Sequence, residues 1–516
     1  MSSKNKLKGG ALGLIAGTVA IGAVAMYDLT QKKRAVLHNY PVIGHARYLL
    51  NKIRPQIQQY FIERDWDGRP FNRTTREDIY ARAKNEKHEE SFGSLEDVEK
   101  VGGEWLVHSM TPLDPPETPP RVRVGGPECK RPYDMSLLNV SAMSFGALSA
   151  NAIRALNEGA AKGGFAHDTG EGGISDYHRE GGGALVWEIG TGYFGARTPS
   201  GDFDPAEFAD KSADDQVKMV SLKLSQGAKP GLGGVLPGSK VTPEIARIRD
   251  VPVGEKCVSP AQHRVFSTPI ELIEFIAKMR ELSGGKPTGF KLCVTSREDV
   301  LAICKAMIKV GTAPDFIIVD GSEGGTGAAP VEFEDHVGMP LTQGLLTVRN
   351  ALVGTGMRSR IKVAASGKIA EGNDLVKRLI QGADYTNSAR AMMMALGCIQ
   401  SLRCATNTCP VGVATQDPRR QRGLDVPTKA ERVFQYQRNT LTEAMRLMAS
   451  MGAATAADLE PAMLRRNTSK HASTSYAELY DWLGDGELLA DPPADWRATW
   501  EHADPQRFGV APLARS

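Results

Sequence analysis

Short apolar runs that end in glycine or serine recur through the middle of the chain, and helix-like segments follow most of them. The runs are rich in valine, isoleucine and leucine and lack polar alternation, which is typical of parallel strands buried on both faces. We expect strands within 137–146, 220–227, 289–294, 315–325, 361–368 and 383–390. Helical patterns follow several of these runs and indicate βα units, at 147–164, 296–311, 369–382 and 391–397.

Repeated βα units favour an α/β fold built on a (β/α)8 TIM barrel, with a doubly wound open sheet as the alternative. At about 250 residues for a typical barrel, a chain of 516 residues has room for further segments. The expected division is an N-terminal membrane anchor at 1–30, a membrane-proximal extension at 31–110, the barrel at 111–450 and a C-terminal tail at 451–516.

The anchor is expected because the stretch from Gly9 to Tyr27 is uncharged and lies between basic residues. A helix of this length, rising about 1.5 Å per residue, just spans a hydrocarbon core, which predicts a single-pass transmembrane helix. A signal peptide cleaved near Ala25 and a soluble apolar helix are the alternatives. The basic residues after the stretch place the protein in the inner or cytoplasmic membrane, with the catalytic domain facing the cytoplasm.

Net charge and cysteine content indicate which partners and which cellular compartment to expect. The formal net charge of +3 gives no reason to expect a nucleic-acid partner. Seven cysteines are an odd number, and they are scattered except for three at 398–409. A secreted disulfide framework would be denser and usually even in number, so the pattern indicates a reducing compartment in which thiols stay free.

Small, polar and cationic residues stand directly after the predicted strands, where the active face of a barrel would lie. They are Ser144 and Gly146, Lys223, Ser225 and Gln226, Lys291, Ser366, Gly367 and Lys368, and Ser388 and Arg390. The last two loops suit a phosphate group, because small residues expose backbone N–H groups and a following helix N-terminus adds its dipole. Arg390 would add a charge-assisted hydrogen bond, although ordinary βα turns explain these residues about as well.

Two glycine-rich stretches lead to different expectations about ligand binding. "GTGYFG" at 190–195 matches a dinucleotide-binding motif, but a strong following helix and a suitably placed acidic residue are lacking, so we reject that function. The stretch 320–330, "DGSEGGTGAAP", follows an apolar run and would let the backbone approach a ligand closely.

Three cysteines, Cys398, Cys404 and Cys409, stand close together in the sequence. Such spacing brings thiolates together, as an iron–sulfur cluster requires, and three ligands suit a 3Fe–4S cluster or a 4Fe–4S cluster with an outside ligand. Zinc is disfavoured because no nearby histidine completes a tetrahedral set, and the reducing compartment disfavours a disulfide. On spacing alone, three buried small cysteines are an equal alternative.

Longer motifs resemble the FMN-binding synthase domain of the glutamate synthase family, in its stand-alone, archaeal-type form. "MSFGALS" at 143–149 is similar to the family's first-strand flavin loop, and "TGEGG" at 169–173 to its Ser-Gly-Glu-Gly-Gly element. "SQGAKPGLGGVLPGSKVTPEIA" at 225–246 resembles the family signature over its whole length. The glycine loop at 320–330 and "NTCPVGVATQ" at 407–416 are similar as well, so the resemblance covers roughly residues 100–450.

The resemblance implies a TIM barrel that binds FMN beside a 3Fe–4S cluster. It also implies reductive amination, in which ammonia condenses with 2-oxoglutarate and reduced FMN delivers a hydride to C2 of 2-iminoglutarate, giving glutamate. The implied catalytic residues are Lys291, Glu171 and Gln226, and the implied cluster ligands are Cys398, Cys404 and Cys409. The implied FMN-binding residues are Met143, Ser144, Gly146, Lys223, Gln226, Lys291, Gly324, Gly325, Ser366, Gly367, Ser388 and Arg390.

Departures from the family qualify this function. The chain opens without the nucleophilic cysteine of a glutaminase domain, so ammonia is expected free or from a partner. A NAD site is not evident, so electrons are expected from ferredoxin or a separate reductase subunit. "SPAQHRVF" at 259–266 and "LCVTSRED" at 292–299 replace family sequence near the expected substrate. Alternatives are therefore an enzyme acting on another 2-oxo or amino acid, such as the N-methylglutamate-forming relatives, or a membrane-tethered electron-transfer subunit.

Overall fold

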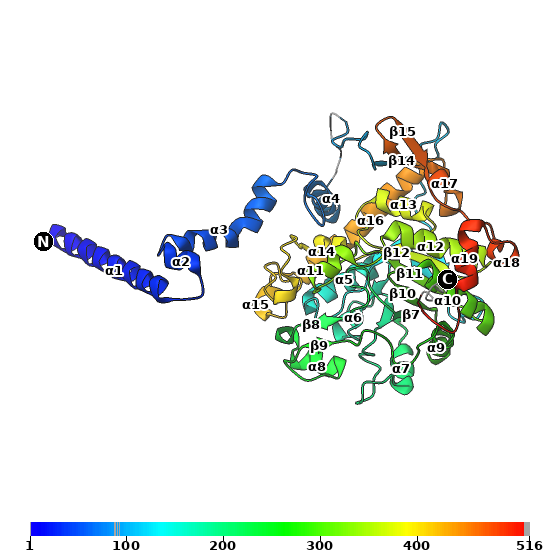
Figure 1. Ribbon diagram of the computed structural model, residues 1–516, viewed down its shortest axis with the longest axis horizontal. Coiled ribbons are helices and arrows are strands. Elements are labelled where there is room, and N and C mark those ends of the chain that lie inside the picture. Colours follow the sequence, from blue (N-terminus) through cyan, green and yellow to red (C-terminus); the bar gives the residue numbers. More distant parts are fainter. Residues whose placement is uncertain (1, 87–88, 90, 92, 510–516) are drawn as a thin grey trace, which may run out of the picture. The chain divides into compact units, whose positions relative to one another are not determined.

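The computed structural model describes residues 2–509 apart from 87–88, 90 and 92, and the chain divides into two compact units, Met1–Thr75 and Arg76–Ser516. In the second unit eight parallel strands close into a barrel in sequence order (Figure 1). The strands are β4 (Leu138–Val140), β5 (His167–Asp168), β6 (Leu185–Ile189), β7 (Val217–Lys223), β10 (Thr288–Leu292), β11 (Phe316–Asp320), β12 (Lys362–Ser366) and β13 (Tyr385–Ser388). The predicted TIM barrel is confirmed.

Helices cover the outside of the barrel and bury the outer face of its parallel strands, while side chains inside the barrel bury the inner face. The helices between successive strands are α5 (Ala150–Gly163), α6 (Asp176–Arg179), α7 (Pro205–Ser212), α8 (Pro243–Arg249), α9 (Pro269–Leu282), α10 (Arg297–Val310), α11 (Val331–His336), α12 (Leu341–Gly354) and α13 (Gly372–Ile380). After β13 come α14 (Arg390–Leu396), α15 (Pro418–Gln421) and α16 (Val426–Ser450). The long α16 packs against α5 and α13 and completes the helical layer between the last and first strands.

A hairpin closes the amino end of the barrel. It is formed by β2 (Arg121–Val124) and β3 (Tyr133–Ser136), which pair antiparallel. Val124 and Met135 from the hairpin are buried in one apolar cluster with barrel residues such as Val186. This plug leaves the carboxyl ends of the strands as the face on which loops can build a site.

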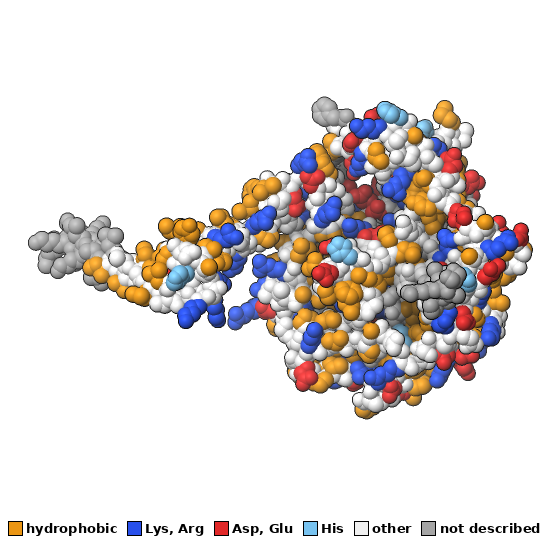
Figure 2. Space-filling model, viewed as in Figure 1, with side chains coloured by type: hydrophobic (Ala, Val, Ile, Leu, Met, Phe, Trp, Pro, Cys, Tyr) orange, Lys and Arg blue, Asp and Glu red, His pale blue; other side chains and the backbone are white. Residues whose placement is uncertain are grey.

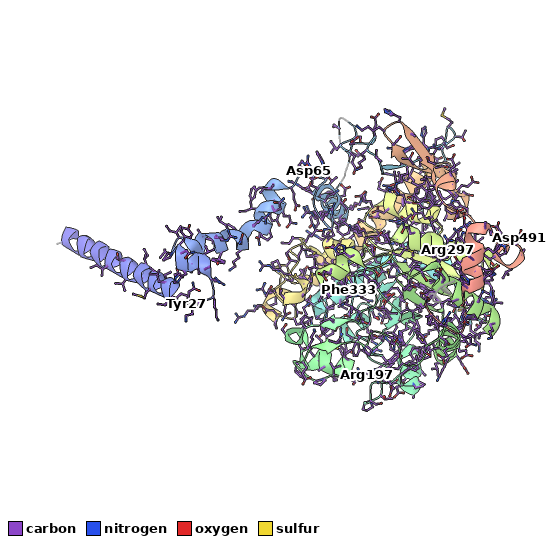
Figure 3. All side chains as sticks on the ribbon, viewed as in Figure 1. Tyr27, Asp65, Arg197, Arg297, Phe333 and Asp491 are labelled. Atoms are coloured by element: carbon purple, nitrogen blue, oxygen red, sulfur yellow. The ribbon has the colours of Figure 1, made fainter. Side chains whose placement is uncertain are left out.

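The remaining elements of this unit lie around the barrel. A three-stranded antiparallel sheet contains β1 (Glu104–Leu106), β14 (Leu464–Ser469) and β15 (Ala472–Ser475), and β8 (Val235–Leu236) pairs with β9 (Cys257–Val258). The C-terminal helices are α17 (Tyr476–Leu479), α18 (Glu487–Ala490) and α19 (Ala494–His502). The Arg297 guanidinium of α10 lies 4.0 Å from the centre of the Trp496 ring and holds α19 against the barrel. Arg297 is labelled in Figure 3 beside the C-terminal helices.

The first unit consists of helices. They are α1 (Ser2–Thr30), α2 (Ala35–Asn39), α3 (Gly44–Ile57), a π-helical turn (Gln58–Ile62) and the start of α4 (Arg73–Lys84). The Asp28 carboxylate is buried and accepts hydrogen bonds from the Val42 N–H at 2.9 Å and from His45 Nε2 at 3.0 Å. These bonds tie the end of α1 to the turn before α3.

The predicted transmembrane anchor is wrong. In the described part of the chain, every helix is too short or too polar to cross a membrane. The apolar stretch within α1 contains five glycines and five alanines between Gly9 and Tyr27, and these small residues contribute little hydropathy. The predicted localisation in the cytoplasmic membrane rested on this anchor and is wrong with it.

Charges of both signs are interspersed over the visible face of the second unit (Figure 2). A mixed surface of this kind does not concentrate a field of one sign.

Candidate active site at the carboxyl ends of the barrel strands

The inner wall of the barrel changes from apolar to charged toward the carboxyl ends of the strands. Ala166, Val186 and Ile318 belong to the apolar core inside the barrel. Side chains alternate across a strand, so the residue two positions later faces inward as well. Inward-facing positions near the carboxyl end are therefore Asp168, Glu188, Lys223, Lys291, Asp320, Ser366 and Asn387.

Lys291 and Glu188 form a buried ion pair across the barrel. The Lys291 ammonium contacts Glu188 Oε2, and the two side chains are 5% and 1% exposed. Burial alone would lower the pKa of Lys291, but Glu188, with Asp168 and Asp320, raises it above its usual value. Lys291 is thus held as a cation in the floor of the site.

Glu171 and Lys223 form a second ion pair above this floor. Lys223 Nζ lies 3.1 Å from Glu171 Oε1 and donates to Gln226 Oε1 at 2.7 Å. Burial would raise the pKa of Glu171, but Lys223, followed by Arg249 and Lys229, lowers it overall. The predicted catalytic residues Glu171 and Gln226 therefore share one lysine, and Glu171 is ionised.

Two glycines make room for the Glu171 carboxylate. A Cβ at Gly234 would lie 1.8 Å from Glu171 Oε1, and a Cβ at Gly190 would lie 2.5 Å from Glu171 Oε2. Gly190 opens the "GTGYFG" stretch, so at least this glycine accommodates a carboxylate of the site.

The signature loop at 225–240 docks on the glycine loop after β11. The Gly227 N–H donates to Asp320 Oδ2 at 2.8 Å, and Lys229 Nζ donates to the Ala328 carbonyl at 2.7 Å. Gln226 Nε2 lies 3.3 Å from Thr326 Oγ1. Burial lowers the pKa of Lys229 to about 8. The two glycine-rich stretches therefore form one wall of the site.

The residues predicted to bind phosphate lie together after β12 and β13. Arg390 is largely enclosed: it donates to the Glu323 carbonyl at 2.6 Å, and a Cβ at Gly325 would lie 2.8 Å from its Nε. Gly367 has a φ of +139°, a conformation that glycine readily adopts. Ser388 Oγ donates to the Ile369 carbonyl at 2.7 Å, so this hydroxyl already serves the turn.

Ser366, Gly324 and Gly325 lie beside these residues. Ser366 Oγ lies 3.4 Å from Ser141 Oγ, across the strands β12 and β4. The Gly324 N–H donates to the Gly321 carbonyl at 2.8 Å and turns the glycine loop back over the barrel. Helix α14 is only seven residues long, so the charge of Arg390 is the stronger attraction for an anion there.

The first-strand loop, Met143 to Gly146, lies against Asp168 and Arg249. The Met143 N–H donates to the Asp168 carbonyl at 3.4 Å. Arg249 Nη2 donates to Ser144 Oγ and to the Phe145 carbonyl, both at 3.1 Å. The structure therefore brings the predicted loop residues Met143, Ser144 and Gly146 next to a buried arginine.

The cysteine loop packs behind this first-strand loop. Gln416 Nε2 donates to the carbonyls of Gly146 at 3.1 Å and Leu148 at 2.8 Å. The thiols of Cys398, Cys404 and Cys409 are free, and burial, with a contribution from the other two thiols, raises the pKa of Cys398 to about 12. Within the described ranges, no group of three or more His, Cys, Asp or Glu side chains is arranged to hold a metal ion.

Lys240 connects the two loops. It is 2% exposed, and its Nζ donates to the Ala147 carbonyl at 2.9 Å. Asn407, in the cysteine loop, donates to the carbonyl of the neighbouring Ser239 at 3.1 Å. Burial lowers the pKa of Lys240 to about 8, while the charges of Cys404 and Cys409 oppose that shift. A buried cation thus lies between the cysteine loop and the first-strand loop.

Sequence reasoning missed several residues of this face. Arg249 ends α8, 105 positions after its partner Ser144, and only its place just beyond the signature stretch could have indicated it. Asp168 and Glu188 lie inside the barrel on β5 and β6. β5 has only two residues and β6 is buried throughout, so neither strand shows a pattern that reveals which side chains face inward.

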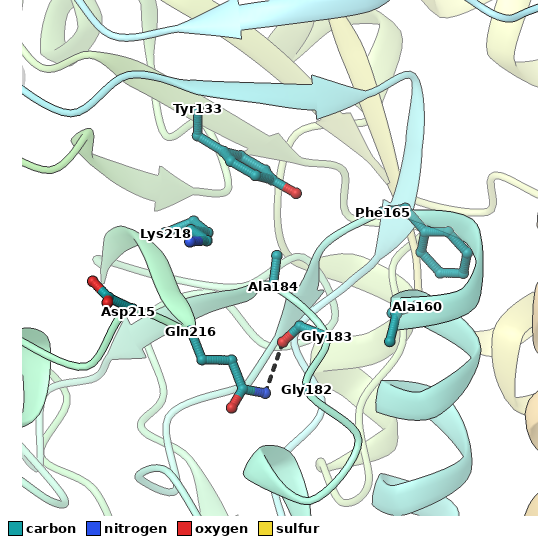
Figure 4. Close-up of a pocket in the computed structure, with 11 residues that line it drawn as sticks. Tyr133, Ala160, Phe165, Gly182, Gly183, Ala184, Asp215, Gln216 and Lys218 are labelled. Carbon is teal, nitrogen blue, oxygen red and sulfur yellow. Dashed lines mark hydrogen bonds between the residues drawn. The ribbon is translucent and has the colours of Figure 1, made fainter.

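A cavity of about 440 Å³ lies at the opposite, amino end of the barrel (Figure 4). Its lining comes from α5, β3, the segments before β5, β6 and β7 and the start of β7, and it includes Tyr133, Phe165, Asp215 and Lys218. Gln216 Nε2 donates to the Gly183 carbonyl at 2.8 Å beside it. It shares no residue with the predicted site, and barrel chemistry is carried by the other face, so we do not assign the reaction to it.

Comparisons with known proteins identify the family to which the chain belongs. The conserved region in glutamate synthase matches residues 126–454. The glutamate synthase large subunit-like protein YerD of Bacillus subtilis (strain 168) is 38% identical over 467 residues, which cover 82% of this chain and 88% of that protein. The archaeal-type glutamate synthase (NADPH) of Thermotoga neapolitana is 34% identical over 313 residues, 60% of this chain and 58% of that protein.

Solved structures are more distant. A flavocytochrome b2 double mutant with pyruvate bound is 13% identical, with a TM-score of 0.42, and the match covers 92% of this chain and 96% of that one. The family match over residues 126–454, together with the similarity to YerD over most of both chains, shows that this chain belongs to the glutamate synthase family of oxidoreductases.

Proposed function

We propose that this chain is an FMN-dependent glutamate synthase that aminates 2-oxoglutarate reductively through 2-iminoglutarate. The observation that carries the proposal is the pair of buried lysine–carboxylate contacts at the carboxyl ends of the strands, Lys291 with Glu188 and Lys223 with Glu171. They lie where a barrel places its chemistry and within the region that matches the family.

The residues present fit FMN. Arg390, enclosed beside Gly325 and the ends of β12 and β13, supplies a cation for a phosphate group. Lys291, kept charged by Glu188, supplies a cation in the floor for the electron-poor ring. When bound, FMN supplies the hydride for the reduction.

The chain's own residues would bind and orient a dicarboxylic 2-oxo acid. Lys223, Lys229 and Arg249 all act on Glu171 electrostatically, so three cations converge on one region of the site. Such a set suits a substrate with two carboxylates. Glu171, being ionised, accepts a hydrogen bond or a proton from ammonia as it adds to the substrate carbonyl.

The cysteine loop fits a 3Fe–4S cluster better than a single metal ion. The thiols of Cys398, Cys404 and Cys409 are free and close enough to influence one another's pKa. An iron–sulfur cluster would be held by these three thiolates and would supply electron transfer at this site. Contacts from Gln416 and Lys240 to the first-strand loop support a position of the cysteine loop next to the proposed flavin site.

We propose that ammonia and electrons both come from outside the barrel, the electrons from ferredoxin or a separate reductase subunit. The test is turnover of the purified chain with a chemical or protein reductant, ammonium or glutamine as nitrogen source, and a panel of 2-oxo acids. Glutamate formed from 2-oxoglutarate and ammonium supports the proposal. Preference for another acid, or for glutamine, contradicts that part of it.

A second candidate is an enzyme acting on a different 2-oxo or amino acid, for example one that forms N-methylglutamate. The observation favouring it is that both departures from the family lie against the site. His263 Nε2 lies 2.9 Å from the Lys223 carbonyl, and the Cys293 N–H donates to Ser225 Oγ at 2.9 Å. Methylamine in place of ammonium in the same assay separates the two functions.

A further inference from the structure

The floor of the site contains more buried carboxylates than cations. Asp168, Glu188 and Lys291 face inward from β5, β6 and β10, and they are 3%, 1% and 4% exposed. The Lys291 ammonium contacts Glu188. One ammonium cannot neutralise two carboxylates, so one negative charge in the set would lack its own cation.

The next cation is already engaged. Lys223 lies 3.1 Å from Glu171 and 2.7 Å from Gln226 Oε1. Asp168 Oδ1 accepts the Gly170 N–H at 3.0 Å, a backbone bond that stabilises a carboxylate but does not balance its charge. A carboxyl group taken out of water beside another carboxylate, without a cation of its own, is neutralised by a proton.

We propose that Asp168 is a neutral carboxylic acid at physiological pH and holds a proton in the floor of the site, while Glu171 above it is ionised. The role that we give to this proton rests on the proposed function, whereas the protonation state of Asp168 does not. Reduction of a neutral imine takes a hydride to carbon and a proton to nitrogen. Glu171 supplies that proton after taking one up from ammonia, and the proton on Asp168 serves instead to keep Lys291 directed toward Glu188.

The groups that face Asp168 support this assignment from each neighbouring strand. Burial, followed by Glu188 on β6, raises the pKa of Asp168 to about 8, while Lys291 on β10, the Gly170 N–H and Lys223 on β7 lower it. Tyr385 on β13 is buried, and Asp168 is among the groups that raise its pKa. The proton therefore stays on Asp168 through the neutral range.

Asp168 is thus a positioning residue for Lys291. A neutral Asp168 leaves the ammonium directed toward Glu188, whereas an ionised Asp168 would compete for it. Gly170, whose Cβ would lie 2.7 Å from the Ser144 N–H nitrogen, keeps this acid directly beside the first-strand loop. Loss of the proton from Asp168 would therefore change the electrostatic surroundings of both Lys291 and the first-strand loop.

Infrared difference spectroscopy of the purified full chain between pH 6.5 and pH 10 (about two pH units on the alkaline side of 8) tests the assignment without turnover. We expect a buried protonated-carboxyl band that disappears at alkaline pH. Asp168→Asn should abolish the band. Asp210→Asn, at an exposed position on α7, should leave it unchanged. Absence of the band in the native chain, or its survival in Asp168→Asn, overturns the inference.

Unfolding in urea supplies a second readout. The pKa of Asp168 is raised on folding, so its contribution to stability is fully present below 3.8 and is lost as pH rises through about 8. Asp168→Asn, which resembles the neutral acid in shape, should become more stable relative to the native chain as pH rises across that window. A constant difference in unfolding free energy overturns the inference.

The two proposals fail separately. A carboxyl band at Asp168 in a chain that forms no glutamate contradicts the proposed function only. Glutamate formation by a chain that lacks the band contradicts only the proton on Asp168. In an active chain, we further expect the alkaline decline of kcat near pH 8 to be absent in Asp168→Asn.

Discussion

Lys223 Nζ lies 3.1 Å from Glu171 Oε1, and the two residues come from different segments of the barrel, the end of β7 and the loop after β5. The pair joins the "TGEGG" element to the end of the strand that leads into the signature stretch. It keeps the carboxylate ionised despite burial. The arrangement gives the site a base and a cation in contact with each other.

Replacing Glu171 by Gln should lower kcat/KM for ammonia-dependent glutamate formation by about 100-fold or more, because general base catalysis contributes on that order. The amide keeps the shape of the side chain but cannot accept a proton. FMN content should be unchanged. Glu274→Gln, at an exposed position on α9, is the control, and equal activity of the two variants would remove Glu171 from the mechanism.

Replacing Gly234 by Ala should displace the Glu171 carboxylate, because the new Cβ would lie 1.8 Å from Glu171 Oε1. We expect a loss of activity comparable with that of Glu171→Gln, with the chain still folded. Gly484→Ala is the matched control, since its Cβ meets only Glu487 Oε2 at an ordinary 3.6 Å. Full activity of Gly234→Ala would show that the position of this carboxylate does not matter.

Replacing Cys404 by Ser should remove the iron and the paramagnetic signal of the cluster while leaving FMN bound. Cys129→Ser, remote in sequence from the loop, should retain both. Lys240→Met should weaken iron retention because it removes the cation near Cys404 and Cys409, and Lys240→Arg should restore part of it. Native iron content in Cys404→Ser would exclude this cysteine as a ligand.

Stability should fall in acid because of two buried histidines. The rings of His167 on β5 and His178 on α6 lie 5.2 Å apart, and burial lowers the pKa of His167 to about 3 and that of His178 well below its usual 6.5. Below pH 6.5 these histidines bind protons in the unfolded chain but not in the folded chain. Their contribution to the free energy of unfolding is therefore fully present above pH 6.5 and is lost as the pH falls toward 3.

Urea unfolding between pH 7.5 and pH 5 measures this loss in the native chain and in His167→Asn (a range spanning about one pH unit on either side of 6.5). We expect a flatter pH dependence in the variant. His471→Asn, at an exposed position, should follow the native curve. Identical curves for His167→Asn and the native chain would show that this histidine does not titrate with folding.

The barrel could be predicted from the sequence because strands such as β11 and β12 are short apolar runs that end in a polar residue, Asp320 and Ser366. β5 could not, since it is two residues long and both are polar. The anchor was predicted from the absence of charge, but glycine and alanine lack the apolar surface that a membrane span needs. An uncharged stretch of sufficient length is therefore not enough to predict a membrane-spanning helix.

The motif residues could be placed on one face because barrel strands end on the same side. Their pairing could not be predicted. The bond between Arg249 and Ser144 joins residues 105 positions apart, and the excess carboxylate at Asp168 appears only when β5, β6 and β10 close into one wall. Tertiary contacts of this kind leave no periodic pattern in the sequence.

A single-turnover experiment tests reductive amination of 2-oxoglutarate by this chain. The purified chain is reduced anaerobically, then mixed with 2-oxoglutarate and ammonium, and glutamate is counted against bound FMN. We expect about one glutamate per flavin, with reoxidation that depends on both substrates. A chain that binds no FMN, or a reduced flavin that stays reduced when both substrates are present, would contradict it.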